Sequence, residues 1–481
     1  MSQSFYIALG KLMALLLSFV IPLCLTRFLT PNDYGIYSQF YTFLFLIVPI
    51  FSCGIPSSLY FYYRTESDES SRSSIVANNF FAVFAITILG SLVLLIPIVN
   101  QFILGENLKT YTYYLILCVL LLVPTNMLEP LYILRNNKWL MAFYPSIVAL
   151  IRVGMIITSA IIFRTIDAIL ISVCLVHIIL FLFTVPYIFK KEKISINLFR
   201  YVEYDILKKQ ISYGLPFGLA IIVMTLSKSF DKVMCISYLS PAEYAIYAVS
   251  FFGIPGIMQI YDSLSVVNVV NMTNFYKKGD YQNIIRTYKK FVIKTISFST
   301  PIIFIVCVFA EQIICFIFTD KYLEAVPLFQ IYIFSFIINM LGAGTILRAM
   351  GKTKYTFRAQ LLACTLTIPI TYFLIKTYGM NGALIGAMMG ILVPKIFQIY
   401  FEINILKCTI LTYFPWKNFV KILFICGSCL IPFIFIQKYL IVNVFLAVIL
   451  SFIYIVLSYS LEIVFSTFIV NKQQLFSFIK K

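Results

Sequence analysis

The segment L-T-P-N-D-Y-G-I-Y-S at residues 29–38 returns about 210 residues later as L-S-P-A-E-Y-A-I-Y-A at residues 239–248. Two looser matches keep nearly the same spacing: residues 133–135 with 138 match 346–348 with 352, and residues 167–170 match 381–384. Three landmarks in register indicate a duplicated half. Such a duplication is typical of transporters that are built from two lobes.

Long apolar runs flank both copies of the segment. The chain has 481 residues, of which 61% are hydrophobic and only 12% are charged. Runs of about 20 apolar residues recur from end to end, and each is long enough to cross a bilayer core of about 30 Å. Such runs cross lipid as helices, because a helix satisfies its own backbone hydrogen bonds. The sequence therefore predicts an all-α polytopic membrane protein with about 14 transmembrane helices.

The repeat divides these spans into three groups. We expect an N-terminal six-helix lobe at residues 1–204, a C-terminal six-helix lobe at 205–405, and two extra helices with a cytoplasmic tail at 406–481. Because six is even, both lobes enter the membrane in the same direction, as parallel repeats with the transport path between them. The expected spans are residues 4–26, 37–61, 76–99, 111–134, 140–163, 166–189, 211–236, 245–271, 291–310, 326–347, 356–376, 380–403, 418–437 and 439–461.

The net charge of +18 reflects 37 Lys and Arg against 19 Asp and Glu. Many of the cations gather in alternate loops, including residues 190–209, 277–290, 348–358 and 407–421. This bias is typical of loops that face the cytoplasm. It predicts that both termini are cytoplasmic, and it assigns the positive charge to topology and contact with anionic membrane lipids rather than to nucleic acid.

The repeated segment has a structural interpretation and a functional one. Its Leu-[Ser/Thr]-Pro start ends one helix, and Asp33 or Glu243 lies near the start of the next. Proline suits the first turn of a helix, and an acidic side chain complements the positive end of the helix dipole. We therefore expect a helix cap in each lobe, with contact to a substrate as the alternative.

Three segments carry a family resemblance. Residues 27–37 read R-F-L-T-P-N-D-Y-G-I-Y, residues 318–325 read F-T-D-K-Y-L-E-A, and residues 378–383 read Y-G-M-N-G-A. In this order and spacing they resemble the Wzx-type polysaccharide-biosynthesis flippases of the multidrug/oligosaccharidyl-lipid/polysaccharide (MOP) exporter superfamily, and the resemblance covers nearly the whole chain. Apart from Arg27 after the first span and the cations inside the spans, no residue decisively separates the branches of that superfamily.

The resemblance implies a MATE-like fold in the inner or cytoplasmic membrane of a bacterium. It implies a protein that moves undecaprenyl-pyrophosphate-linked oligosaccharide, such as an O-antigen or capsule repeat unit, from the cytoplasmic to the outer leaflet by alternating access. Coupling to H⁺, Na⁺ or the membrane potential is expected, without a bound cofactor. Polysaccharide polymerases and glycosyltransferases are the expected protein partners.

Cations inside the expected spans are the candidate substrate-binding residues. A charge at the bilayer centre costs at least about 2.5–3.5 kcal/mol, so it usually faces a cavity or a partner. Arg152, in the middle of its span, is expected to line the central cavity or to pair with Glu129. The full candidate set is Arg152, Lys228, Lys232, Lys11, Lys395 and Arg27. A surplus of cations suits an anionic headgroup such as a pyrophosphate.

Four residues are candidates for ion coupling: Asp231, Glu129, Asp262 and His177. Asp231 lies three residues after Lys228 and one before Lys232, so an ion pair within the helix is as good an interpretation as a cavity. His177, the single histidine, titrates near neutrality, although a lone histidine on an apolar helix is more often a packing residue.

The candidate enzyme motifs in the sequence do not meet the requirements of known catalytic sites. Residues 344–353 suggest a phosphate-binding loop, but the first glycine of that motif falls on Ile346 and no strand precedes it. The sequence has no His/Cys/Asp cluster at metal-ligand spacing and no long loop for a catalytic domain. We therefore expect no enzyme. The alternatives to a flippase are a MATE-like drug or small-solute antiporter and, less favoured, a membrane polysaccharide polymerase.

Overall fold

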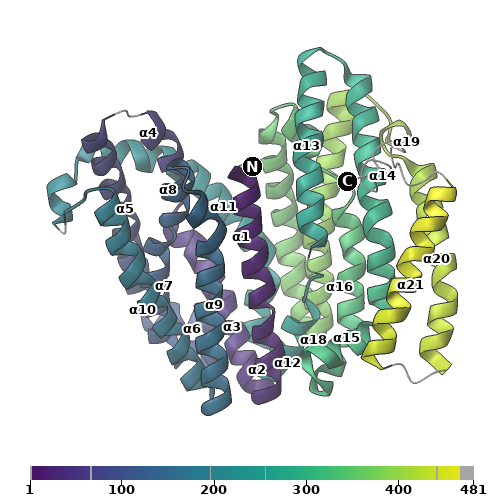
Figure 1. Ribbon diagram of the computed structural model, residues 1–481, viewed down its shortest axis with the longest axis horizontal. Helices are drawn as coiled ribbons and strands as arrows, with labels where there is room; N and C mark the ends of the chain where they lie inside the picture. The colour runs from purple at the N-terminus through teal and green to yellow at the C-terminus, as the bar shows by residue number, and fades with distance from the viewer. Residues whose placement is uncertain (1–2, 66–67, 196, 255, 440–442, 466–481) are drawn as a thin grey trace. The chain divides into compact units, whose positions relative to one another are not determined.

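The computed structural model describes residues 3–65, 68–195, 197–254, 256–439 and 443–465. Its chain packs into two units, residues 1–245 and residues 246–481, and the boundary falls within one helix, α12 (Pro241–Ser250). Each unit is a bundle of helices (Figure 1). The lobe boundary that the sequence predicts at residue 205 divides the two copies of the repeat. The boundary between the two packed units does not test it, so it stays a prediction.

The first unit begins with α1 (Gln3–Ser18), which packs along α9 (Lys138–Ile162). Gly10 brings the two backbones together, because a Cβ there would lie 2.5 Å from the carbonyl oxygen of Met141. The other elements up to α12 are α2 (Val20–Phe28), α3 (Pro31–Ser52), η1 (Ile55–Ser58), α4 (Leu59–Thr65), α5 (Glu69–Leu94), α6 (Pro97–Lys109), α7 (Thr112–Thr125), α8 (Leu128–Leu134), α10 (Ile166–Lys191), η2 (Leu198–Tyr201) and α11 (Tyr204–Tyr238).

In the second unit, α14 (Tyr281–Val308) is the central helix, against which α13, α16, α20 and α21 pack (Figure 1). The remaining bounds are α13 (Ile257–Lys277), α15 (Ala310–Phe318), η3 (Asp320–Ala325), α16 (Val326–Asn339), α17 (Thr345–Ala349), α18 (Thr353–Leu406), α19 (Ile410–Tyr413), α20 (Trp416–Tyr439) and α21 (Val444–Val464). The two extra C-terminal helices of the prediction, α20 and α21, lie beside each other and against α14.

Among the described residues, 11 helices are long and apolar enough to cross a membrane. The all-α, polytopic fold class is therefore confirmed, while the number fourteen stays a prediction. One helix, α18, has 54 residues and is interrupted at Gly379, where φ is 55°. The predicted spans 356–376 and 380–403 lie on either side of this interruption.

The helices differ from the predicted spans in three details. Within the first predicted span the helix is interrupted at Phe19, between α1 and α2, because Pro22 lacks the N–H that would continue the helical ladder, but residues Leu9–Phe28 together remain long and apolar enough to cross a membrane. The span predicted at 245–271 divides into α12 and α13, since Gly256 has a φ of 91° that a helix cannot accommodate. The charges of Glu311, Asp320, Lys321 and Glu324 predict a short polar loop within residues 307–340. This segment instead forms helix α15 followed by the 3₁₀ helix η3.

The repeated segment caps a helix in both copies. The Thr30 hydroxyl oxygen accepts a hydrogen bond from the backbone N–H of Asp33, at 3.2 Å. In the second copy the Ser240 hydroxyl accepts from the N–H of Glu243, at 3.3 Å, and the Glu243 carboxylate accepts from the N–H of Ser240, at 2.8 Å. This reciprocal pair is a capping box, so the structural interpretation of the repeat is confirmed.

Candidate functional site

Arg152 lies on α9 inside the first unit, half-buried. It acts electrostatically on two tyrosines of α3, Tyr37 and Tyr41, and on His177 of α10. Its Nε is buried and has no hydrogen-bond partner within the described part of the chain. A buried donor without a partner is costly and marks a place where a ligand or water can bind.

Glu129 forms its ion pair with Lys11. The Lys11 Nζ donates to a Glu129 carboxylate oxygen at 2.8 Å, across α1 and α8. The two side chains are 58% and 44% exposed, so water screens their attraction. Within the described ranges the structure records an ion pair of Glu129 with Lys11 and none with Arg152, and the role of Arg152 stays a prediction.

Asp231 of α11 is a buried carboxylate with a cation directly beside it. The Lys232 Nζ lies 3.3 Å from the Asp231 carboxylate, so these two neighbouring residues form an ion pair within α11. Lys228, one turn earlier on α11, is exposed. The expected charge cluster is present. Its recorded ion pair joins Asp231 to Lys232, the next residue, rather than to Lys228, three residues earlier.

His177 is enclosed by its own helix. Its Nδ1 lies 2.7 Å from the carbonyl oxygen of Val173 on α10, and because that oxygen can only accept, Nδ1 must donate. The side chain is 2% exposed. This geometry favours the packing interpretation, and a role for His177 in proton coupling stays a prediction.

The remaining candidates belong to α2, α13 and α18. Arg27 is exposed at the end of α2 and donates to the carbonyl oxygen of Leu23. Asp262 is exposed on α13, and Lys395 is half-buried on α18. Both of the latter belong to the second unit, and their roles stay predictions.

Three buried glutamates carry chemistry that the sequence analysis missed. Glu192, just after α10, is 3% exposed and accepts two hydrogen bonds from Arg135, at 2.6 and 2.8 Å. The Tyr63 hydroxyl also donates to this carboxylate, at 3.2 Å. Although burial alone lowers the pKa of the Arg135 guanidinium, its bonds to Glu192 raise that pKa above the usual value. Burial and the nearby Glu192 charge raise the pKa of Tyr63.

Glu402 occupies the matching place in the second unit. Near the end of α18, it is fully buried and accepts the backbone N–H groups of Ile346 and Leu347, at 2.9 and 3.1 Å. The Tyr413 hydroxyl donates to its other oxygen at 2.5 Å. The repeat was the signal for both sites: Ile346 and Leu347 match Ile133 and Leu134, the two residues before Arg135.

The third buried carboxylate is Glu462 of α21. Its two oxygens accept from the hydroxyl of Ser297 on α14 and, at 3.3 Å, from the thiol of Cys426 on α20. Glu462 therefore joins three helices of the second unit through polar contacts. No sequence motif marks this position, because its partners come from helices far apart in the chain.

No group of three or more His, Cys, Asp and Glu side chains that could hold a metal ion occurs among the described residues.

Solved structures share this fold. The lipid II flippase MurJ, in an inward closed conformation, is 18% identical, with 95% of this chain and 99% of that chain covered and a TM-score of 0.69. An inward-facing MATE family multidrug resistance transporter of the MOP superfamily is 13% identical, with 85% and 99% covered and a TM-score of 0.60. A MOP superfamily transporter from Pyrococcus furiosus is also 13% identical, with 85% and 96% covered and a TM-score of 0.52. The predicted MATE-like fold is confirmed.

Sequence relatives give the family. The uncharacterized membrane protein MJ1068 of Methanocaldococcus jannaschii is 27% identical over 177 residues, which are 36% of this chain and 34% of that protein. The chain thus matches about a third of the length of this curated relative. Residues 24–327, more than half of the chain, match the family described as polysaccharide biosynthesis protein. The match agrees with the expectation that the chain is no enzyme. This multi-pass membrane protein belongs to the polysaccharide biosynthesis protein family.

Proposed function

We propose that this protein is a flippase for undecaprenyl-pyrophosphate-linked oligosaccharides. It moves them from the cytoplasmic to the outer leaflet of a bacterial cell membrane by alternating access of its two lobes. Membership in the polysaccharide biosynthesis protein family supports this function, as does the shared fold with a lipid II flippase. Both termini lie in the cytoplasm, as the basic loops indicate.

Arg152 is the observation that supports the anionic substrate most directly. It is a cation within an apolar helix, and its buried Nε has no hydrogen-bond partner among the described residues. A guanidinium offers several N–H donors to the oxygens of a pyrophosphate. Lys11, Lys228 and Lys232 add positive charge to the same unit, against Glu129 and Asp231. Substrate binding in the first lobe thus begins with the pyrophosphate at Arg152.

The transport cycle needs an energy source, for which we propose an H⁺ or Na⁺ gradient or the membrane potential. Asp231 is the carboxylate best suited to ion coupling, because it is buried beside Lys232 and loss or gain of a cation there changes the local charge. Asp262, His177 and Glu129 are the other proposed coupling residues. Polysaccharide polymerases and glycosyltransferases supply and consume the substrate as partners.

A deletion strain tests the proposed function. Cells without the protein accumulate lipid-linked repeat units on the cytoplasmic side and lose surface polysaccharide, and the gene restores both. Unchanged surface polysaccharide in a strain without a redundant transporter would contradict the proposal.

A drug antiporter is the second candidate function, because the fold is also that of a MATE multidrug transporter with a TM-score of 0.60. The surplus of cations disfavours organic cations as substrates. Greater sensitivity of the deletion strain to toxic cations, with normal surface polysaccharide, would favour this candidate instead.

A further inference from the structure

A cavity of about 180 Å³ opens on the second unit, where the chain just after α16 meets α18, α19 and α20. Its lining presents only apolar surface, and its walls include Leu341, Ile399, Ile410, Trp416 and Phe419. Water does not fill such a cavity, because apolar walls offer it no hydrogen bonds, and an empty cavity lacks the contacts that its walls would otherwise make. The cavity therefore suits an apolar ligand.

Polar contacts behind the walls hold them in place. The Tyr413 ring forms part of the lining, and its hydroxyl donates to the buried Glu402 carboxylate at 2.5 Å. The Trp416 Nε1–H donates to the carbonyl oxygen of Ile410 at 3.2 Å. The rings of Phe414 and Trp416 meet edge to face, with their centroids 4.8 Å apart. These contacts oppose collapse of the walls, so the cavity is preformed for a ligand.

The segment at the mouth of the cavity lies at the membrane interface. It connects α18 to α20, yet Ile410, Leu411 and Trp416 are 52%, 75% and 41% exposed. Apolar side chains are costly to expose to water, and an exposed Trp is typical of the boundary between headgroups and acyl chains. Lys407 and Lys417 bracket the segment, and both are exposed, as lysines are that reach from this level to water. The mouth therefore opens toward the acyl chains of the bilayer.

We propose that this cavity binds an acyl chain of a glycerophospholipid from the cytoplasmic leaflet. The leaflet follows from the basic stretch 407–421, which is predicted to face the cytoplasm. Glycerophospholipids form the bulk of the bilayer, so by mass action their chains reach the cavity at a far higher concentration than the chain of a carrier lipid does. The bound chain supplies the contacts that the apolar walls lack. This site is separate from the proposed transport path, and its test needs no transport.

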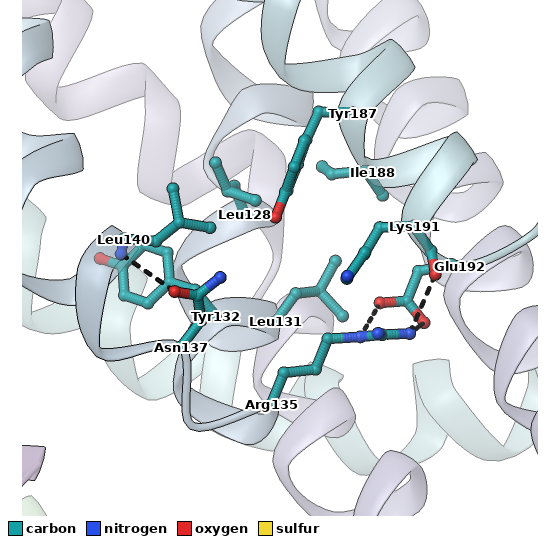
Figure 2. A pocket seen from close by; sticks show the side chains of 10 residues that line it. All are labelled: Leu128, Leu131, Tyr132, Arg135, Asn137, Leu140, Tyr187, Ile188, Lys191 and Glu192. Atoms are coloured by element: carbon teal, nitrogen blue, oxygen red, sulfur yellow. Dashed lines mark hydrogen bonds and ion pairs between the residues drawn. The ribbon is translucent and has the colours of Figure 1, made fainter.

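The matching place in the first unit is filled by the protein itself. Glu192 matches Glu402 in the repeat, and the hollow beside it, between α8, α9 and α10, measures about 10 Å³, room for about one water molecule (Figure 2). Leu128, Leu131 and Ile188 pack there and are each at most 3% exposed. The repeat therefore does not duplicate the cavity, and the first unit serves as an internal control.

Trp416 and Trp139 are the two tryptophans of the chain, so each can report alone. The purified full-length protein in detergent is titrated with phosphatidylcholine that carries bromine on its acyl chains, because bromine quenches the fluorescence of a neighbouring Trp. In Trp139→Phe, which keeps Trp416, we expect quenching that saturates near about one lipid per protein. In Trp416→Phe, the exposed Trp139 should need at least about tenfold more lipid, since it does not line the cavity.

Variants in the Trp139→Phe background test the cavity itself. Ile399→Phe fills it from α18 and Ile410→Phe from the exposed mouth, where a larger side chain leaves the fold intact. Each should raise the lipid concentration at half-maximal quenching about tenfold, because the chain then buries less apolar surface. Ile396→Phe is the matched control, since Ile396 is on α18 and 53% exposed but does not line the cavity, and it should change nothing.

Three results would overturn the proposal. Parallel quenching of Trp416 and Trp139 would show that chains meet the two units alike. Equal losses in Ile396→Phe and Ile399→Phe would show that the cavity does not decide binding. Displacement of the brominated lipid by undecaprenyl phosphate at equal concentration would show that the cavity takes an isoprenoid chain in place of an acyl chain.

Discussion

Glu192 holds Arg135 through two hydrogen bonds, of 2.6 and 2.8 Å, and so ties the end of α10 to the end of α8. In the other unit Glu402 ties the end of α18 to α17, by accepting backbone N–H groups of the residues that match those before Arg135. In both halves a buried glutamate thus accepts hydrogen bonds from a short helix. The donors are a guanidinium in the first half and backbone N–H groups in the second. A carboxylate near the end of the sixth predicted span of each lobe secures the short helix around the Ile-Leu-Arg motif.

Replacing Glu192 by Ala should destabilise the fold by about 3 kcal/mol, because it leaves the partly buried Arg135 charge without its partner. The matched control is Glu69→Ala, since Glu69 pairs with Lys193 at 2.8 Å with both side chains more than 60% exposed. An exposed pair contributes about 0–1 kcal/mol. Thermal unfolding of the purified variants in detergent measures both, and equal shifts would contradict the assignment.

Replacing Glu402 by Leu should cost more stability than replacing it by Gln. Leucine leaves the N–H groups of Ile346 and Leu347 unpaired, at about 1–3 kcal/mol for each buried donor. The glutamine carbonyl oxygen can still accept from both of them. Thermal unfolding and hydrogen exchange at residues 346 and 347 compare the two variants. A Gln variant as unstable as the Leu variant would show that the negative charge, rather than the acceptor, is what the site needs.

Asp68 should make stability depend on pH at the start of α5. The Ser70 hydroxyl and the Ser71 backbone N–H donate to its carboxylate, at 2.6 and 3.0 Å, and they lower its pKa in the folded protein. The contribution of the Asp68 carboxylate to folding stability is therefore complete above its pKa in the unfolded chain, about 3.9. It is lost as the pH falls through its pKa in the folded protein. The difference in unfolding temperature between wild type and Asp68→Asn should shrink as pH falls below about 4. A difference that is constant with pH would refute this.

Replacing Arg152 by Ala should reduce transport at least tenfold while the protein still folds, because the side chain is proposed to bind the substrate anion. Arg152→Lys should retain part of the activity if charge matters more than the planar guanidinium. Transport is measured as surface polysaccharide in complemented deletion cells, alongside the amount of folded protein in the membrane. Full activity of the Ala variant would remove Arg152 from the substrate path.

The sequence predicted those features of the fold that depend on local patterns. Apolar runs of membrane length gave the helices, and the Pro and acidic residues of the repeated segment predicted the caps that Thr30 and Ser240 form. The breaks at Phe19 and Gly256 were missed, because isolated glycines and prolines are common in transmembrane helices and do not by themselves end one.

The candidate site was harder to predict because its partners are distant in sequence. Charge within an apolar run identified Arg152, but the nearby Tyr37 and His177 come from other helices. Glu192 and Glu402 looked like ordinary charges at the ends of spans. Their buried state depends on donors contributed by α8 and α17, which only the folded chain brings close.

The most direct measurement is the movement of a fluorescent undecaprenyl-pyrophosphate oligosaccharide between leaflets of vesicles that contain the purified protein. We predict transfer by the wild type at a rate at least tenfold above that of protein-free vesicles, and a rate near that background for Arg152→Ala. Transfer of a neutral dolichol-like lipid at the same rate, or no transfer by the wild type under an imposed H⁺ gradient, Na⁺ gradient or membrane potential, would contradict the proposed flippase function.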